Sequence, residues 1–294
     1  MAPSSDPRYP RKSIDVLGHR MTYVDVGNGD PIVFLHGNPT SSYMWRNVMP
    51  YLEGAGRLIA PDLIGMGDSD KLPGQGDDRY ALAEHGRYLG KLFELLGVTE
   101  RVTFVLHDWG CALGFDWANR HRQAIKGIAY MEAIVQPLTW ADWPEEHVAT
   151  FQALRSPAGD QMILEDNMMV DVLIPEIVVR KLTDEEFAHY RRPYVASGEA
   201  RRPTLSWARQ IPIEGEPADV VDVVTAYGKW LSVSFEVPKL FINSENPDVL
   251  KGASRDFCRT WPNQIEITVP GIHFLHEDSP DAIGEALASW YRGI

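Results

Sequence analysis

One stretch near the middle of the chain constrains the fold more than any other. Residues 102–106 form a continuous β-branched and apolar run, which is typical of a buried strand. From Cys111 onward the apolar residues recur at helical spacing, so a helix follows. Residues 107–110, with the sequence His-Asp-Trp-Gly, lie between the two. A strand that enters a helix through such a tight turn presents the side chain at the turn, here Asp108, at the end of a sheet.

The identity of this residue limits the chemistry that the turn can support. The carboxylate of Asp108, with a pKa near ~4, is already ionised at neutral pH, whereas a serine would need a base. Attack by aspartate on a saturated carbon leaves an ester that water can hydrolyse, while serine would leave a stable ether. Asp108 therefore favours displacement at an alkyl carbon over acyl transfer. The alternative is that Asp108 only caps the following helix, and this turn alone does not decide between the two.

Composition narrows the classes of protein and partner. The chain has 294 residues, of which 44% are hydrophobic, enough for one large core with an inserted subdomain. A formal net charge of -13 argues against nucleic acid and anionic membranes as partners. Cys111 and Cys258 have no metal or disulfide spacing. The chain shows no secretory apolar segment and no run that could span a bilayer, so we expect a cytoplasmic protein.

Strands and helices are predicted to alternate along most of the chain. Short apolar runs predict strands at residues 14–17, 21–26, 31–35, 58–60, 102–106, 125–131, 238–242 and 265–269. Helical periodicity predicts helices at residues 42–52, 81–96, 219–231 and 279–291. This alternation indicates an α/β fold with a mostly parallel central sheet flanked by helices. In such folds the active groups lie beyond the carboxyl ends of the strands.

The alternation stops between residues 133 and 213, where large side chains lie among short helical segments. We interpret this region as a helical cap, inserted between a first core part (residues 1–132) and a second core part (residues 214–294). Most of its large side chains are expected to form the core of the cap, and a minority to line a pocket. We expect the substrate pocket to be lined by Trp143, Phe151, Met169, Ile177, Trp207 and Leu250.

Three polar residues follow predicted strands in the order nucleophile, acid, histidine. They are Asp108, Glu132 and His273, and the order is that of the α/β-hydrolases. Of the nine histidines, only His273 has the required position. Asp248 and Glu245 are alternative acids, but Glu132 is favoured because it ends a strand directly, while residues 243–248 read as a loop.

Several motifs together carry a resemblance to a known family. They lie at residues 36–45 (His-Gly-Asn-Pro-Thr-Ser-Ser-Tyr-Met-Trp), 62–69, 107–110, 131–132 and 271–274. The combination resembles the haloalkane dehalogenases of the α/β-hydrolase superfamily, in the subgroup with an Asp-His-Glu triad that includes the hexachlorocyclohexane-degrading enzyme. The resemblance covers nearly the whole chain. Ala208 and Met169 stand where the family would be expected to have a proline and a larger aromatic residue.

The resemblance implies a role for each residue of the site. Asp108 would displace halide and form an alkyl-enzyme ester, and His273, oriented by Glu132, would activate the water that hydrolyses it. The side chains of Asn38 and Trp109 would bind the halide, and their backbone N–H groups would form an oxyanion hole. No metal or organic cofactor is needed. The expected partners are a small halogenated aliphatic substrate, water and a halide ion, and the expected products are an alcohol, halide and a proton.

Three other functions remain open from the sequence. An epoxide hydrolase would share the Asp turn and the histidine, with Tyr190 or Tyr194 as the acid for ring opening. A Renilla-type coelenterazine luciferase shares several of the same motifs. A ligand-binding relative without activity would have no need for the complete triad. We expect a dehalogenase that acts as a monomer and serves detoxification.

Overall fold

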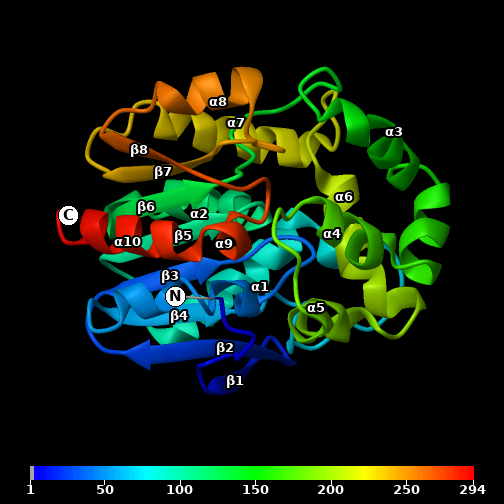
Figure 1. Cartoon of the computed structure of the whole chain (residues 1–294), viewed down its shortest axis with the longest axis horizontal. Coiled ribbons are helices and arrows are strands. Elements are labelled where there is room, and N and C mark those ends of the chain that lie inside the picture. The colour runs from blue at the N-terminus through cyan, green and yellow to red at the C-terminus, as the bar shows by residue number, and fades with distance from the viewer. Residues whose placement is uncertain (1–2) are drawn as a thin grey trace.

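The computed structural model describes residues 3–294 and is built on an eight-stranded sheet (Figure 1). The strand order is β1-β2-β4-β3-β5-β6-β7-β8. β1 and β2 pair in antiparallel fashion, β2 runs antiparallel to β4, and all the other pairs are parallel. The strands are β1 Arg11–Val16, β2 His19–Gly27, β3 Pro31–Leu35, β4 Arg57–Pro61, β5 Val102–His107, β6 Ile125–Met131, β7 Lys239–Ser244 and β8 Gln264–Val269. The mostly parallel sheet predicted from the sequence is thereby confirmed.

Helices cover both faces of this sheet. α2 (Trp109–Arg120) packs between α1 (Leu82–Leu96) and α7 (Ala218–Leu231) behind the sheet in the view of Figure 1. α10 (Pro280–Tyr291) lies in front of it, and α9 (Leu275–Asp278) precedes α10. α8 (Gly252–Arg259) connects β7 to β8. Because both faces are covered, the central strands are mostly apolar, and every residue of β5 is buried, including Thr103 and His107.

The predicted helix at residues 42–52 is wrong in its type. Two separate 3₁₀ turns, Ser42–Trp45 and Met49–Leu52, occupy this segment. Pro50 has no backbone N–H to donate, so it cannot take part in a continuous α-helical hydrogen-bond ladder. The chain uses short-range bonds instead, such as the 3.0 Å bond from the Val48 N–H to the Trp45 carbonyl.

Between β6 and α7, residues 133–213 contribute no strand to the sheet and lie beyond one end of it, at the right in Figure 1. Leu138, near the start of this segment, pairs with Ile213 at its end. The Leu138 N–H bonds to the Pro212 carbonyl at 2.9 Å, and the Glu214 N–H bonds to the Leu138 carbonyl at 2.9 Å. The chain therefore leaves the sheet and returns to it at one place. The helices of this segment are α3 Glu145–Leu154, α4 Ile174–Glu176, α5 Asp184–Arg191 and α6 Arg202–Gln210, with π-helical turns at Asp160–Glu165 and Met169–Leu173.

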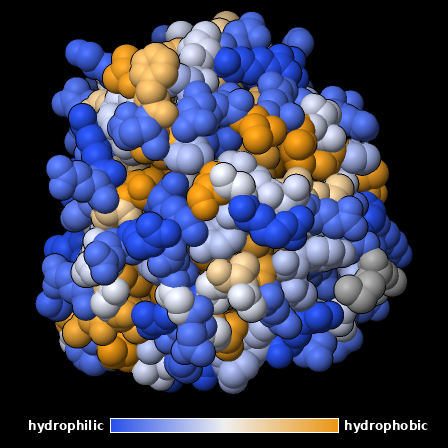
Figure 2. Space-filling view, turned by 90° about the vertical axis from the view of Figure 1, so that its left-hand side faces the viewer, coloured by the Kyte–Doolittle hydropathy of each residue, from blue (hydrophilic) through white to orange (hydrophobic). Residues whose placement is uncertain are grey.

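The surface opposite this segment is largely hydrophilic. Figure 2 views that face, where hydrophobic side chains occur in small groups separated by hydrophilic ones. Across residues 3–294, no helix has both the length and the apolar character needed to cross a membrane.

Candidate active site

The turn after β5 holds Asp108 in an unusual backbone conformation. Its φ and ψ are 51° and -126°, in a region that non-glycine residues rarely adopt. Neighbouring glycines make room for this turn. A Cβ on Gly110 would lie 2.3 Å from the Leu35 carbonyl oxygen, and one on Gly114 would lie 2.5 Å from Leu106 Cδ2. Leu106, a larger residue than such turns usually carry, is thus accommodated by Gly114.

The carboxylate of Asp108 is buried and held by the loop after β3. Its Oδ2 accepts the backbone N–H of Asn38 at 2.9 Å, and a Cβ on Gly37 would approach the same oxygen to 2.3 Å. Burial raises the pKa of Asp108, while the charge of His273 and the backbone N–H groups of Asn38 and Trp109 act in the opposite direction. The carboxylate of Asp108 therefore lies against the backbone N–H groups of both Asn38 and Trp109, and Oδ2 is the oxygen bound by Asn38.

His273 and Glu132 are paired at the ends of their strands. Nδ1 of His273 lies 3.2 Å from Oε2 of Glu132, which also accepts the backbone N–H groups of Asp248 at 3.0 Å and Val249 at 2.9 Å. Burial alone would lower the pKa of His273, but the hydrogen bond to Glu132 and the charges of Asp108, Glu132 and Asp248 raise it to about 9. Of the candidate acids, Glu132 is the one in contact with His273 Nδ1. An imidazole held in this way presents its other nitrogen, Nε2, for proton transfer.

Two further histidines support the surrounding loops. Nε2 of His36 accepts the Leu63 N–H at 2.9 Å, and its Nδ1 lies 2.9 Å from the Gly37 carbonyl. His107 Nε2 lies 2.9 Å from the carbonyl oxygen of His273. Burial lowers the pKa of His36 to about 4 and that of His107 well below its usual value. Both act as neutral structural groups.

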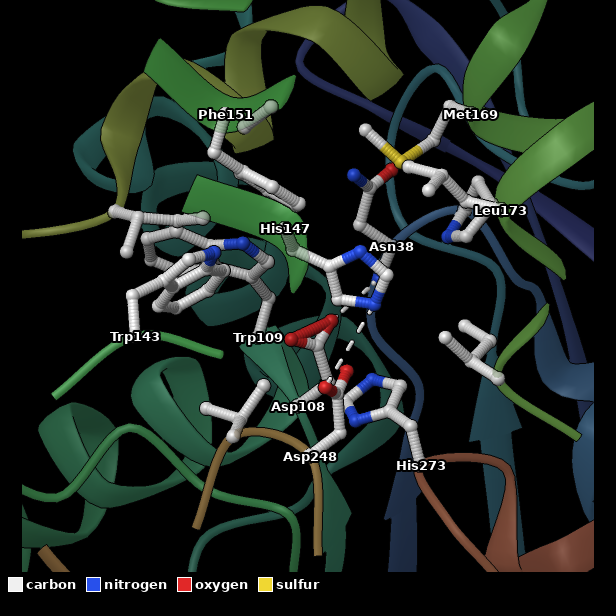
Figure 3. Close-up of a pocket in the computed structure, with 15 residues that line it drawn as sticks. Asn38, Asp108, Trp109, Trp143, His147, Phe151, Met169, Leu173, Asp248 and His273 are labelled. Atoms are coloured by element: carbon white, nitrogen blue, oxygen red, sulfur yellow. Dashed lines mark hydrogen bonds and ion pairs between the residues drawn. The ribbon is translucent and has the colours of Figure 1, made fainter. Parts of the chain in front are cut away.

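The side chains of Asn38 and Trp109 line the same cavity as Asp108 and His273 (Figure 3). Asn38 Nδ2 donates to the Thr204 carbonyl at 3.1 Å, which fixes the amide and uses one of its two N–H groups. The indole of Trp109 is stacked on Trp207 with the ring centroids 4.4 Å apart. The structure therefore brings two side-chain donors next to a carboxylate.

Four of the six predicted pocket residues line this cavity: Trp143, Phe151, Met169 and Ile177. The other two, Trp207 and Leu250, are not among the residues that line it. Trp207 is fully buried behind Trp109, where it stacks on His85 at 4.3 Å. Leu250 is also buried, and Val249 lines the cavity in its place. In both cases the sequence predicted the right neighbourhood but not which side of the backbone faces the cavity.

Several residues that line the cavity were not predicted from the sequence, and two of them are polar. The missed residues are Pro39, His147, Leu173, Ala208, Ile211, Asp248 and Val249. His147 lies one turn before Phe151 on α3. Residues four apart share a face of a helix, so a prediction that Phe151 faces the cavity also predicts that His147 does. Asp248 had been considered only as an acid for the histidine. Its carboxylate instead lies at the cavity wall, 3.9 Å from His147 Nε2.

One trio of described side chains, Glu146, His147 and Asp248, has potential metal-ligating atoms within 4.8 Å of one another. Glu146 is exposed, and exposed acidic groups of this kind are common without an ion. Neither Asp108 nor His273 belongs to the trio.

The fold and the sequence of this chain are similar to those of known enzymes. Residues 30–157 match the family model for the alpha/beta hydrolase fold, and the eight-stranded, mostly parallel sheet agrees with that class. The chain is 58% identical to a haloalkane dehalogenase from Sphingobium indicum over 294 residues, covering 100% of this chain and 99% of the relative. Its structure matches that of haloalkane dehalogenase DbeA from Bradyrhizobium elkani with a TM-score of 0.91 and 38% identity, covering 97% and 98% of the two chains. The chain belongs to the haloalkane dehalogenase family.

A relative of different activity is more distant. The chain is 40% identical over 289 residues to the coelenterazine h 2-monooxygenase of Renilla reniformis, covering 96% of this chain and 91% of the relative. The similarity to a Renilla-type luciferase therefore extends over nearly the whole chain and is not limited to the short motifs.

Proposed function

We propose that this enzyme hydrolyses haloalkanes to an alcohol, halide and a proton, with Asp108 as the nucleophile. The observation that carries the proposal is the buried Asp108 carboxylate, whose Oδ2 is bound by the Asn38 N–H in a cavity that also contains His273. Because Oδ2 is held, Oδ1 is the oxygen left to attack the carbon that bears the halogen. The C–O bond forms as the C–halogen bond breaks, and the bonding pair leaves with the halide.

The departing halide develops negative charge in a cavity of mainly apolar lining. The second N–H of the Asn38 amide and the indole N–H of Trp109 are the donors available to stabilise it. The stacking of Trp109 on Trp207 and the bond from Asn38 to Thr204 fix both donors before substrate arrives. A fixed donor needs no reorganisation as charge develops, which is why such groups act mainly in the transition state.

The second step hydrolyses the ester. His273, as general base, takes a proton from water, and the resulting hydroxide adds to the Asp108 carbonyl carbon. The oxyanion forms at Oδ2, where the backbone N–H groups of Asn38 and Trp109 stabilise it. Its collapse breaks the bond between the carbonyl carbon of Asp108 and the alkoxy oxygen, so that the alcohol leaves, Asp108 is restored as a carboxylate and the proton taken up by His273 is released. Once Asp108 is esterified, its negative charge no longer favours protonated His273, so the imidazole is better able to act as a base. Glu132 holds the ring through Nδ1 and stabilises the imidazolium that forms.

The epoxide hydrolase alternative requires a tyrosine that donates a proton in the cavity, and neither candidate tyrosine lies there. Tyr190 is buried, with its hydroxyl bonded to Glu277, and Tyr194 is fully buried. Neither is among the residues that line the cavity. Tyr190→Phe should therefore leave haloalkane turnover nearly unchanged.

Halide release from a panel of bromoalkanes and chloroalkanes tests the proposal. We expect release by the wild type and none by Asp108→Ala, with both proteins folded by circular dichroism. Wild-type-like turnover of 1-bromobutane by the folded Asp108→Ala variant would refute the assignment. Light emission with coelenterazine, in the absence of halide release, would favour the activity named for the Renilla relative.

We also propose how the chain is organised and where the enzyme acts. We propose that residues 133–213 act as a cap, because they supply Trp143, Phe151, Met169 and Ile177 to the cavity. We also propose a monomer; on the face in Figure 2 the hydrophobic groups are separated by hydrophilic ones, unlike the continuous apolar surfaces of obligate dimers. A cytoplasmic location and a role in detoxification complete the proposal.

A further inference from the structure

Four charged side chains meet where the inserted segment packs on the core. Arg46 comes from the first core part, Glu277 from the second, and Arg180 and Glu186 from the inserted segment. Arg46, Glu186 and Glu277 are buried, and the Arg180 side chain is 23% exposed. We call these four residues the arginine–glutamate cluster. None of them lines the cavity that holds Asp108.

Each carboxylate of the cluster contacts both guanidinium groups. Glu277 accepts Arg46 Nη1 at 2.6 Å and Nη2 at 2.9 Å, and it also accepts Arg180 Nη2. Glu186 accepts Arg46 Nη2 at 3.0 Å. It also accepts Arg180 Nη1 and Nη2, at 2.8 Å and 2.7 Å. Positive and negative charges therefore alternate around the cluster and balance one another.

The main contribution of such a cluster is a fixed geometry. The free energy needed to remove four charges from water is roughly offset by their mutual attraction, so little net stability remains. Paired guanidinium and carboxylate groups do, however, allow only a narrow range of distances and angles. The cluster therefore fixes the inserted segment relative to α9, the helix that carries Glu277.

α9 and the residue before it are attached to the inserted segment by further hydrogen bonds. The Phe274 N–H donates to the Ile177 carbonyl at 3.0 Å. The Asp278 carboxylate accepts the Arg180 N–H at 2.9 Å, and Arg180 Nε donates to the Glu277 carbonyl at 2.7 Å. The stretch from Phe274 to Asp278 is therefore held against the inserted segment at both of its ends.

His273 directly precedes this attached stretch in the chain. Its ring contacts Glu132 through Nδ1, but the position of its backbone depends on that of Phe274. A displacement of α9 would therefore move His273 and its free nitrogen, Nε2. The nucleophile is positioned differently, because Asp108 lies in the turn after β5 and is bound by the Asn38 N–H.

Building on the dehalogenase function proposed above, we infer that Arg180 and Glu277 are positioning residues for His273. The cluster holds α9 against the inserted segment, and α9 holds the His273 backbone where Nε2 can take a proton from the hydrolytic water. Loss of the cluster slows hydrolysis of the alkyl-enzyme ester, which needs His273. It leaves displacement of halide, which needs Asp108, close to its normal rate.

The test removes one positive and one negative charge together. In Arg180→Met/Glu277→Gln, Arg46 and Glu186 still form an ion pair at 3.0 Å, so neither buried charge is left alone. Bromide release in the first turnover of saturating 1-bromobutane measures displacement. Decay of the butyl-enzyme, followed by rapid quenching and intact-mass spectrometry, measures hydrolysis. We expect hydrolysis to slow by roughly tenfold to a hundredfold, the cost of a misplaced catalytic group, so that the butyl-enzyme accumulates.

Arg192→Met/Asp68→Asn is the matched control. Arg192 Nη1 bonds to Asp68 Oδ1 at 2.6 Å, so this pair also joins the inserted segment to the core. Within residues 3–294, neither side chain makes a hydrogen bond or ion pair with α9. Both rate constants should equal those of the wild type. A slowing of hydrolysis in the control as large as that in Arg180→Met/Glu277→Gln would count against the inference.

A purely structural role for the cluster would lower thermal stability and slow both steps alike. Equal slowing of the two steps, or unchanged hydrolysis in the folded Arg180→Met/Glu277→Gln variant, would therefore overturn the inference and leave the dehalogenase function intact. If that variant does not fold, Arg180→Lys, which keeps the charge but not the paired geometry, decides by the same comparison of steps. Absence of bromide release by the wild type would instead refute the dehalogenase function.

Discussion

Glu132 Oε2 lies 3.2 Å from His273 Nδ1 and is held there by two backbone N–H groups of the loop that follows β7. The acid comes from the end of β6 and its supports from the loop after the neighbouring strand. Three bonds converge on one carboxylate oxygen, so the acid is fixed before any substrate binds. This arrangement favours Glu132 over Asp248 as the partner of the histidine.

Substitution of each carboxylate shows whether Glu132 or Asp248 is the acid that assists His273. Glu132→Gln should lower kcat for 1-bromobutane by roughly two to four decades, because the amide can neither stabilise the imidazolium nor fix its tautomer. Asp248→Asn should lose far less activity toward this substrate. Steady-state halide release measures both. A greater loss in Asp248→Asn than in Glu132→Gln would reassign the acid.

His273→Phe should separate the two steps of the reaction. Displacement of halide requires Asp108 but not His273, so the variant should release halide once and stop at the alkyl-enzyme ester. Intact-mass spectrometry after incubation with 1-bromobutane should show the protein plus a butyl group. The double variant with Asp108→Ala should show no adduct, and an adduct that persisted there would place the ester elsewhere.

The raised pKa of His273 has a consequence for stability. Protonation of His273 is favoured in the folded state, where its pKa is about 9, over an unfolded value near 6.5. This contribution to the free energy of unfolding is therefore complete below pH 6.5 and is lost as the pH rises through about 9. Urea unfolding at both ends of this range should show a larger loss of stability in the wild type than in His273→Phe. Parallel losses in the two proteins would contradict the pKa.

The halide donors can be removed one at a time. Trp109→Phe keeps most of the ring and removes the indole N–H, and Asn38→Ala removes the amide. Each should cost roughly 3 kcal/mol, or about two decades in the rate of halide displacement. Chloroalkanes should suffer more than bromoalkanes because chloride leaves less readily. Halide binding measured by quenching of tryptophan fluorescence in Asn38→Ala should weaken in parallel, and unchanged binding would show that the amide points elsewhere.

Gly37 provides a steric test of the nucleophile's position. A Cβ at this residue would lie 2.3 Å from Asp108 Oδ2, so Gly37→Ala should displace the carboxylate from the Asn38 N–H and abolish most activity. Gly90 lies in α1, where a Cβ would meet nothing within 4 Å, and Gly90→Ala should leave activity unchanged and stabilise the protein by about 0.5–1 kcal/mol. Halide release and thermal unfolding of the two variants distinguish these outcomes. Equal activity in both would show that the carboxylate can move freely.

The centre of the sheet could be predicted from the sequence because its central strands are buried on both faces. A strand of this kind is a short continuous apolar run, and the predicted bounds of β3 and β6 match those observed. Because Asp108, Glu132 and His273 each follow a predicted strand of this sheet, they could be expected to lie close together. The helix predicted at residues 42–52 failed because apolar spacing does not register the missing N–H of Pro50.

The walls of the cavity were harder to predict for a physical reason. In the inserted segment most large apolar side chains are buried or half-buried, whether they face the cavity or the protein interior. Hydrophobicity alone cannot separate Trp143, at the cavity, from Trp207, behind Trp109. His147 was missed because a polar residue on a helix is usually solvated, and only the tertiary fold brings it opposite Asp248.

The pairing of Leu138 with Ile213 has an evolutionary consequence. A segment whose two ends meet can be exchanged for another of different length or sequence without moving the sheet. Asp108, Glu132 and His273 all lie outside the segment, while Trp143, Phe151 and Met169 lie inside it. The residues that carry out the reaction can therefore be conserved during evolution while the segment that contacts the substrate changes.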